Sequence, residues 1–389
     1  MSNDTQPEIR FPGFTEDWEQ RRLSDVASIV GGGTPSTSNP EYWDGDIDWY
    51  APAEIGDQIY VSKSLKTITE LGQQKSSAKI LPIGTVLFTS RAGIGNTAIL
   101  AKEGTTNQGF QSIVPHKNKL DSYFIFSRTH ELKRYGEVTG AGSTFAEVSG
   151  KQMAKMPILI PCINEQRKIG AFFEQLDTTI TLHQRKLDLL KETKKGFLQK
   201  MFPKNGAKVP EIRFPGFTDD WEQRKSKELC TISTGKGNTQ DKIDDGIYPF
   251  YVRSATIEKS NDYLYDQEAV LTVGDGVGTG KVFHYVNGKY NLHQRVYRMY
   301  DFNYVSAKYF YYYFSNNFYK RVMSMTAKTS VDSVRMEMIA DMNIVFPSVK
   351  EQEKIVALFS NLDDTIALHQ RKLDLLKETK KGFLQKMFV

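Results

Sequence analysis

The chain has 389 residues, of which 39% are hydrophobic and 25% are charged. That length permits two or three domains, and the composition is that of an ordinary soluble protein. No run approaches the roughly 18 apolar residues of a membrane span, so we expect no membrane association. The net charge of +5 is compatible with nucleic-acid binding but does not require it.

The N-terminal sequence MSNDTQPEIRF has neither the basic nor the apolar segment of a signal peptide, so none is expected. Cys162 and Cys230 lie far apart, which gives neither a disulfide framework nor a zinc site. The six histidines are scattered and form no metal-ligand set. We therefore expect a cytoplasmic protein that binds no metal itself.

Two segments of the chain occur twice. PEIRFPGFTEDWEQRR at 7–22 returns as PEIRFPGFTDDWEQRK at 210–225, and LHQRKLDLLKETKKGFLQKMF at 182–202 returns unchanged at 368–388. The long segments between these repeats differ. The order of shared block, variable segment and shared helical block therefore occurs twice, which predicts two related halves.

The variable segments contain short apolar runs bounded by Gly, Asn and Asp, which predict strands, and two longer helical patches. The predicted strands are AVLTV (269–273), KVFHYV (281–286), MPILIP (156–161) and MNIVFP (342–347), and the helical patches are 121–135 and 306–324. Weak likenesses join the halves: VLFTSRAGIGN (86–96) with VLTVGDGVGTG (270–280), and NQGFQSIVP (107–115) with HQRVYRMYD (293–301). We predict two α+β domains of one fold with different surfaces.

In both helical blocks the seam positions alternate in steps of four and three, which is a heptad seam. Its apolar members are Ile169, Phe173, Leu176, Ile180, Leu187 and Leu190, and then Ile355, Phe359, Leu362, Ile366, Leu373 and Leu376. His183, Lys194, His369 and Lys380 also occupy seam positions, where we expect them to set the register. Asn164 is a candidate cap for the first helix, and Ser348 with Glu351 has capping-box spacing for the second.

Each predicted helix has about 36 residues and spans roughly 54 Å. Equal seams favour an antiparallel, coiled-coil-like pair with a globular domain at each end, in a pseudo-two-fold arrangement. The alternative is that each helix packs on its own domain or on another subunit. The predicted domains are 1–164, helix 165–202, then 203–350 with a linker at 203–210, and helix 351–389.

Several motifs together resemble the specificity subunits of type I restriction–modification systems. They are GGGTPSTSNPEYWDGDIDWYAPAEI (31–55), LPIGTVLFTSRAGIGN (81–96), NQGFQSIVP, and the Pro–x–x–x–Glu–Gln helix entries PCINEQRKI (161–169) and PSVKEQEKI (347–355). The resemblance implies two target-recognition domains, each reading half of a bipartite site on double-stranded DNA. It also implies that the helices dock two methyltransferase subunits, through which restriction subunits join. S-adenosylmethionine, ATP and Mg would then belong to the partner subunits and not to this chain.

Two motifs resemble catalytic loops incompletely. NPEY at 39–42 is similar to the Asn-Pro-Pro-Tyr loop of adenine-N6 methyltransferases, but Glu41 replaces the second proline and no F-x-G-x-G loop precedes it. GDGVGTGK at 274–281 lacks phosphate-loop spacing. It is either a hairpin turn or a loop whose N–H groups contact a DNA phosphate. We predict a non-catalytic subunit; a coiled-coil adaptor that never touches DNA, and a methyltransferase, are the alternatives.

DNA contacts are expected from loops of the variable segments, because Lys, Arg, Ser and Thr bind phosphates and Arg, Asn and Gln read base edges. The candidates in the first domain are Thr34, Ser36, Arg91, Asn96, Asn107, Gln108, Ser143, Thr144 and Lys151. Those in the second are Lys236, Asn238, Gln240, Arg253, Lys281, His293, Gln294, Arg295, Lys328 and Arg335. The aromatic run FYYYF at 310–314 is expected in the core, with base stacking as the alternative.

Overall fold

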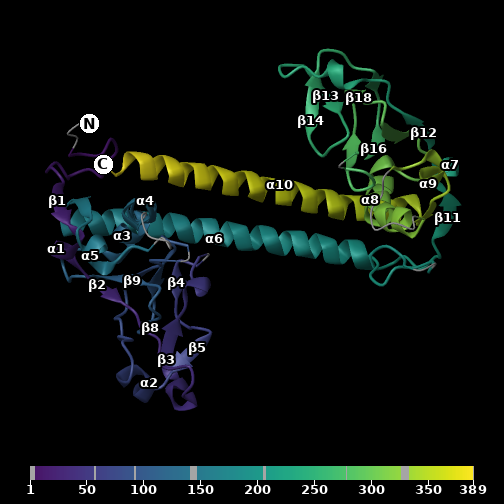
Figure 1. The fold of residues 1–389 in the computed structure, drawn as a ribbon. Coiled ribbons are helices and arrows are strands. Elements are labelled where there is room, and N and C mark those ends of the chain that lie inside the picture. The colour runs from purple at the N-terminus through teal and green to yellow at the C-terminus, as the bar shows by residue number, and fades with distance from the viewer. Residues whose placement is uncertain are drawn as a thin grey trace. The chain divides into compact units, whose positions relative to one another are not determined.

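The computed structural model describes residues 5–56, 58–91, 93–140, 147–204, 207–276, 278–325 and 333–388. It divides into two compact units. Unit 1 comprises Met1–Gln184 with Lys372–Val389, and unit 2 comprises Arg185–Arg371. Two long helices, α6 (Ile163–Lys200) and α10 (Val349–Lys386), each contribute one part to each unit (Figure 1).

Unit 1 is built from three small sheets. Their strand orders are β2 (Ala27–Gly31), β9 (Gln111–Pro115), β6 (Val86–Phe88), β7 (Thr97–Leu100) and β4 (Tyr60–Val61); β5 (Lys66–Ile68), β3 (Trp43–Tyr50) and β8 (Thr105–Thr106); and β1 (Glu19–Arg22) with β10 (Pro157–Ile160). The shorter helices are α1 (Leu23–Val26), α2 (Glu70–Gln74), α3 (Ser122–Ser127), α4 (Thr129–Gly140) and α5 (Gly150–Ala154).

Unit 2 repeats most of this topology, with one strand fewer in the first sheet and one more in the second. Its sheets are β12 (Thr231–Thr234), β19 (Val296–Tyr300), β16 (Ala269–Val273) and β17 (Phe283–Val286); β14 (Ile257–Ser260), β13 (Tyr248–Tyr251), β18 (Lys289–Leu292) and β15 (Tyr265–Asp266); and β11 (Glu222–Lys225) with β20 (Asn343–Phe346). The helices are α7 (Ser226–Leu229), α8 (Ala307–Ser324) and α9 (Met336–Ala340). Strand β13 pairs in parallel with β18 as β3 does with β8, so the prediction of one fold used twice is confirmed.

The start of each long helix is fixed by a buried ion pair from the repeated PEIRFPGF block. Arg10 donates to both carboxylate oxygens of Glu165 at 2.7 and 2.8 Å, and Arg213 donates to those of Glu351 at 2.8 Å each. The glutamates are 0% and 1% exposed. A buried carboxylate needs such a bidentate partner, which explains why the block and the helix entry recur together.

The glutamine of each helix entry makes a second set of bonds. Gln166 donates to the carbonyl of Pro161 at 2.9 Å and accepts from the N–H of Asp121 at 3.0 Å. Gln352 donates to the carbonyl of Pro347 at 2.9 Å, and it accepts from a backbone N–H in the same way. The Pro–x–x–x–Glu–Gln motif therefore joins the start of each long helix to the rest of its unit through hydrogen bonds.

The predicted cap of the first helix is wrong. Helix α6 begins at Ile163, so Asn164 lies inside its first turn, and the carbonyl of Cys162 accepts from Glu165 at 3.0 Å. At the second helix Ser348 lies directly before Val349, the first residue of α10, as expected of a cap, while the Glu351 carboxylate is bound by Arg213. Only at the first helix does the local signal mark the wrong residue.

Within each unit the two helix parts run antiparallel. In unit 1, Phe388 stacks on Phe173 with ring centroids 5.7 Å apart, and further along Lys380 pairs with Asp177 at 2.5 Å. In unit 2, the rings of Phe202 and Phe359 lie 5.9 Å apart, and Lys194 pairs with Asp363. All twelve predicted apolar seam residues are buried or half-buried: Ile169, Phe173, Leu176, Ile180, Leu187, Leu190, Ile355, Phe359, Leu362, Ile366, Leu373 and Leu376.

The aromatic run on α8 lies in the core of unit 2. Phe310, Phe314 and Phe318 are fully buried, and the rings of Phe314 and Phe318 stack at 4.3 Å. These side chains cannot stack on DNA bases while the core is intact. In the described part of the chain, none of the helices is long and apolar enough to cross a membrane.

Candidate nucleic-acid interface

In unit 1, a short turn at 107–109 brings together candidates from separate segments. The N–H of Asn107 donates to the carbonyl of Tyr50 at the end of β3 at 3.0 Å. The N–H of Gly109 donates back to Asn107 Oδ1 at 2.8 Å, which closes the turn. The hydroxyl of Thr34, in the loop after β2, donates to the Gln108 side chain. Thr34, Asn107 and Gln108, predicted separately, therefore lie together.

The glycine run after β2 makes this approach possible. The N–H of Gly33 donates to the carbonyl of Thr106 at 2.8 Å. A Cβ atom on Gly32 would lie 2.0 Å from the carbonyl oxygen of Asn107, where no side chain fits. Glycine is thus required by close backbone approach. The run has a packing role that places Thr34 against the turn.

Arg91 lies beside the same turn. The N–H of Ser90 donates to the carbonyl of Gly109 at 2.8 Å, and the N–H of Val148 donates to the carbonyl of Ser90 at 3.0 Å. The backbone next to Arg91 is thus held from both sides. The absence of a side chain at Gly109 leaves room for Pro52, because a Cβ placed there would lie 2.8 Å from Pro52 Cγ; Arg91 Nε would be 3.6 Å away, at ordinary contact distance.

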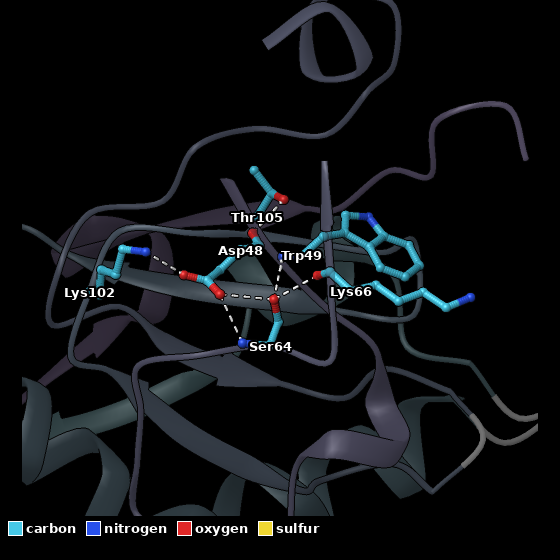
Figure 2. Close-up of polar contacts among 6 residues, drawn as sticks. All are labelled: Asp48, Trp49, Ser64, Lys66, Lys102 and Thr105. Carbon is cyan, nitrogen blue, oxygen red and sulfur yellow. Dashed lines mark hydrogen bonds and ion pairs between the residues drawn. The ribbon is translucent and has the colours of Figure 1, made fainter. Parts of the chain in front are cut away.

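A buried polar network anchors β3, which supports the turn (Figure 2). Asp48 accepts from the N–H and hydroxyl of Ser64 at 2.8 and 3.0 Å and from Lys102 Nζ at 2.7 Å. Burial opposes the charge on this carboxylate, but the bonds from Lys102 and Ser64 outweigh it and hold the pKa of Asp48 below its ordinary value. The carbonyl of Asp48 also accepts from Thr105 at 2.9 Å. The network fixes the strand end that carries Tyr50 and Pro52.

Unit 2 builds the corresponding turn at 293–295 from different side chains. The N–H of His293 donates to the carbonyl of Tyr251 at 3.0 Å, and the N–H of Arg295 donates to His293 Nδ1 at 3.1 Å. Gln294 donates to Asn238 Oδ1 at 2.8 Å, as the Thr34–Gln108 bond joins loop to turn in unit 1. His293 thus plays the part that Asn107 plays in unit 1.

Beside this turn an aspartate lies between two arginines. Asp275 pairs with Arg253 at 3.7 Å and with Arg295 at 3.6 Å. The arginine side chains are 51% and 64% exposed, and the aspartate side chain is 28% exposed. The carboxylate therefore attracts both guanidinium groups without a hydrogen bond to its Oδ1, and their N–H donors stay accessible to a ligand.

His293 is neutral at physiological pH. Burial lowers its pKa, the positive charges of Arg253 and Arg295 lower it further, and Asp275 with Asp241 acts in the opposite direction. The neutral ring is needed here, because Nδ1 accepts the Arg295 N–H and cannot do so when protonated.

The other candidates of unit 1 lie outside this cluster. Ser36 is exposed further along the loop and bonds to the hydroxyl of Ser38. Asn96 is exposed, and its N–H donates to Thr89 Oγ1 at 2.9 Å. Lys151 is exposed on α5. Ser143 and Thr144 lie outside the described residues.

In unit 2, Lys236 and Gln240 are exposed near the second cluster in the chain segment that contains Asn238. Lys281 instead lies over a tyrosine ring of α8 at 4.8 Å. Arg335 is exposed at the start of α9. Lys328 lies outside the described residues.

Three residues of these clusters were missed from the sequence: Pro52, Gly109 and Asp275. None is of a type that reads DNA by preference, and each gains its place only from neighbours far along the chain. A usable signal was present for Asp275, because the likeness of 86–96 to 270–280 aligns it with Arg91. Where one half has a candidate arginine and the other half has an acidic residue at the aligned position, the two halves present different chemistry.

The two incompletely matched motifs form turns. Asn39 Oδ1 accepts from the N–H of Glu41 at 3.1 Å and caps the short 3₁₀ turn at Pro40–Tyr42. Gly276 and Gly280, in the GDGVGTGK segment, have φ of +93° and +65°, which only glycine adopts readily. Among the described residues, no group of three or more His, Cys, Asp or Glu could hold a metal ion.

Two repeated α+β units on long helices, each with one polar turn cluster, define the class of duplicated specificity subunits. The family profile for the type I restriction modification DNA specificity domain matches residues 15–192 and again 218–378. The chain belongs to this family, and it is a specificity subunit of a type I restriction–modification system.

Known proteins agree with this assignment. The MjaIX specificity subunit of Methanocaldococcus jannaschii is 26% identical over 402 residues, which covers 96% of this chain and 93% of that protein. The EcoR124I/EcoR124II specificity subunit of Escherichia coli is 31% identical over 168 residues, or 41% of each chain. The crystal structure of an S subunit from M. genitalium matches with a TM-score of 0.72 at 12% identity over 99% of both chains, which shows the shared fold.

Proposed function

We propose that this chain is the non-catalytic DNA-recognition subunit of a type I restriction–modification complex. Each unit reads one half of a bipartite site on double-stranded DNA through its turn cluster. The helices α6 and α10 dock two methyltransferase subunits, and restriction subunits join through those. S-adenosylmethionine, ATP and Mg act in the partner subunits.

The observation that carries the proposal is one backbone framework presenting different side chains. Unit 1 presents Asn107, Gln108 and Gly109 where unit 2 presents His293, Gln294 and Arg295, and the main-chain bonds that hold the two turns correspond. Base edges are distinguished by the pattern of donors and acceptors offered to them. A fixed scaffold with changed polar groups suits two readers of different sequences.

Identical helix surfaces support the docking of identical partners. Leu182 and Leu189 on α6 are 60% and 62% exposed, and their copies Leu368 and Leu375 on α10 are 65% and 63% exposed. Unit 1 contains Leu182 and Leu375, and unit 2 contains Leu189 and Leu368, so each unit exposes one leucine of each kind on its helix parts. Symmetric partners require repeated surfaces, and two copies of one subunit fit two such surfaces.

The helices also carry repeated positive charge away from the seam. These exposed residues are Arg185, Lys186, Lys191, Lys195 and Lys200 on α6, and Arg371, Lys372, Lys377, Lys381 and Lys386 on α10. A solvated face is the simpler interpretation of such residues. Attraction to the phosphates between the half-sites is the alternative, and salt dependence of binding distinguishes them.

The test is to map methylated bases across a host genome with this chain expressed beside its methyltransferase subunit, and again without the chain. The expected result is a bipartite motif that appears only when the chain is present. If the same methyltransferase is active with another specificity subunit but gives no motif with this one, the proposal is wrong.

The two alternatives have their own readouts on the isolated chain. An adaptor would show no salt-sensitive DNA affinity, whereas a DNA reader loses affinity as a power of salt concentration because phosphate binding releases counterions. Binding of S-adenosylmethionine by the chain alone would instead support a methyltransferase.

A further inference from the structure

Main-chain hydrogen bonds align the two units position by position around their turns. The bond from Asn107 to Tyr50 corresponds to the bond from His293 to Tyr251, at 3.0 Å in both units. The carbonyl of Gly109 accepts at 2.8 Å from the N–H of residue 90, and the carbonyl of Arg295 accepts at 2.8 Å from the N–H of residue 274. The alignment rests on bonds within each unit.

A third pair of bonds extends the alignment. The carbonyl of Ser90 accepts from Val148 at 3.0 Å, and that of Gly274 accepts from Val334 at 2.7 Å. The residues that follow each of these, Arg91 and Asp275, form equivalent antiparallel bridges. Three positions then correspond: Pro52 with Arg253, Arg91 with Asp275, and Gly109 with Arg295.

In both units these three positions are in mutual proximity. A Cβ on Gly109 would lie 2.8 Å from Pro52 Cγ and 3.6 Å from Arg91 Nε. In unit 2 the same three positions form the chain of ion pairs from Arg253 through Asp275 to Arg295. We call each set a trio.

We propose that each trio determines base specificity in its half-site, an inference that rests on the DNA-reading function proposed above. In unit 2 the trio recognises a guanine. An arginine fork donates in parallel to O6 and N7 of guanine, the commonest specific contact to a base. Arg253 and Arg295 keep more than half of their side-chain surface exposed. Asp275 lies 3.6–3.7 Å from both guanidinium groups without a hydrogen bond to its Oδ1, so its charge draws both arginines toward one place before DNA arrives.

The formal charge of the two trios is equal although their chemistry differs. Unit 1 has one arginine, and unit 2 has two arginines and one aspartate, so each trio carries one net positive charge. The attraction of the two trios themselves to phosphates is therefore similar. What changes is the pattern of donors and acceptors, and that pattern specifies bases.

The packing of unit 1 explains why its trio presents one guanidinium. A Cβ on Gly109 would be too close to Pro52 Cγ, at 2.8 Å, and in ordinary contact with Arg91 Nε, at 3.6 Å. A side chain at 109 would press on the proline ring. Positions 52 and 109 therefore have to change together, as they do in the pair Arg253 and Arg295.

The experiment uses the full chain in complex with its methyltransferase subunit. The complex selects from a duplex library randomised across both half-sites, and the base preference at every position is read by sequencing. Arg253→Gln or Arg295→Gln should lower the preference for one guanine of the second half-site by about 10- to 100-fold, the range for loss of one bidentate contact. Arg91→Gln should change the first half-site only, so the variants of one unit are controls for the other.

Two further variants separate base reading from simple charge loss. Arg295→Lys keeps the charge but not the fork, so it should retain affinity and lose guanine preference. Lys320→Gln removes an exposed charge of the same unit on α8, at a residue that is not a DNA-contact candidate, so it should leave every preference unchanged.

The contrary results are equally clear. Uniformly weaker binding with unchanged preferences in the arginine variants would make these residues phosphate contacts and overturn the proposal. Retained guanine preference in both Arg253→Lys and Arg295→Lys would place guanine recognition outside the trio. If the unaltered complex selects no bipartite motif, the proposed function itself fails and the trio proposal falls with it.

Discussion

The side chains of Asn107 and His293 close the same turn in the two units with different chemistry. An amide oxygen accepts the Gly109 N–H in one, and an imidazole nitrogen accepts the Arg295 N–H in the other. Only the bond to the imidazole nitrogen is lost when its acceptor atom is protonated in mild acid. The second turn is thus acid-sensitive where the first is not.

We predict that unit 2 loses stability in mild acid through His293. Burial lowers the pKa of His293, so the folded state favours the neutral ring. The resulting stabilisation is complete above the ordinary histidine pKa of about 6.5 and is lost as pH falls through the lowered value. Unfolding of the full chain in denaturant, followed between pH 8 and pH 5, measures the loss.

The control is His293→Asn, which copies unit 1 and cannot titrate. It should preserve the turn bond and flatten that part of the pH dependence. The titration of His284, whose pKa is also lowered by burial, is present in both proteins and cancels in the difference. Identical pH profiles for the two proteins would show that the turn bond contributes nothing.

The residues of the site were only partly predictable, for a physical reason. Gln108 and Arg91 have side chains that commonly contact DNA, so their type alone marked them as candidates. Pro52 and Asp275 have no such bias, and their roles arise from residues far away in the chain that fold next to them. Local patterns carry no information about such neighbours when one sequence is considered alone.

At the scale of elements, the two helices were the most predictable part, because a heptad seam repeats over their whole length. The start of the first helix was not predictable. Asn164 has the side chain of a cap, but the Arg10–Glu165 ion pair fixes where the helix begins. The strands of AVLTV and MNIVFP were found because short apolar runs are bounded by turn residues.

Substitutions of Leu187 and Leu189 in α6 allow the contribution of helix packing to be measured apart from that of partner binding. Leu187 is 1% exposed and Leu189 is 62% exposed. Leu187→Ala should lower the free energy of unfolding by about 2–5 kcal/mol, because it opens a cavity in a packed seam. Leu189→Ala should change it by less than about 0.5 kcal/mol. Chemical denaturation of the full chain measures both.

The same pair tests the proposed partner surface. Leu189→Asp combined with Leu375→Asp should leave the chain folded and weaken its binding to the methyltransferase subunit, measured by titration calorimetry. Unchanged affinity in the folded double variant would place the partner on another face. Leu187→Ala is unsuitable for this purpose because it alters stability.

For the whole molecule, the distribution of sequence identity is informative. The block at 182–202 is unchanged at 368–388, while the segments that form the two turn clusters differ. A recent duplication would leave both kinds of segment alike. Under the proposed function, selection for two equal docking surfaces and two unequal reading surfaces accounts for the contrast, and helix length and base reading should then be separable.

We therefore predict that heptads inserted after Gln184 in α6 and after Arg371 in α10 lengthen the unread gap and leave both half-sites unchanged. Insertion at these positions, where the units divide, preserves the pairs Asp177–Lys380 and Lys194–Asp363. One heptad adds about 10.5 Å, or about 3 base pairs, to each helix, which turns one half-site by about a third of a DNA turn. Three heptads add about 31.5 Å, close to the 34–36 Å of a full turn.

The expected methylation pattern is thus weak with one heptad and strong with three, at a gap longer by about 9 base pairs. Methylome mapping of cells expressing each variant with the methyltransferase subunit measures gap and half-sites together. A variant with three heptads in α6 alone is the control, because unequal helices cannot keep both ion pairs, and it should lose stability and methylation. Altered half-sites in the balanced variant would show that the helices take part in reading bases, and the separation of roles argued here would be wrong.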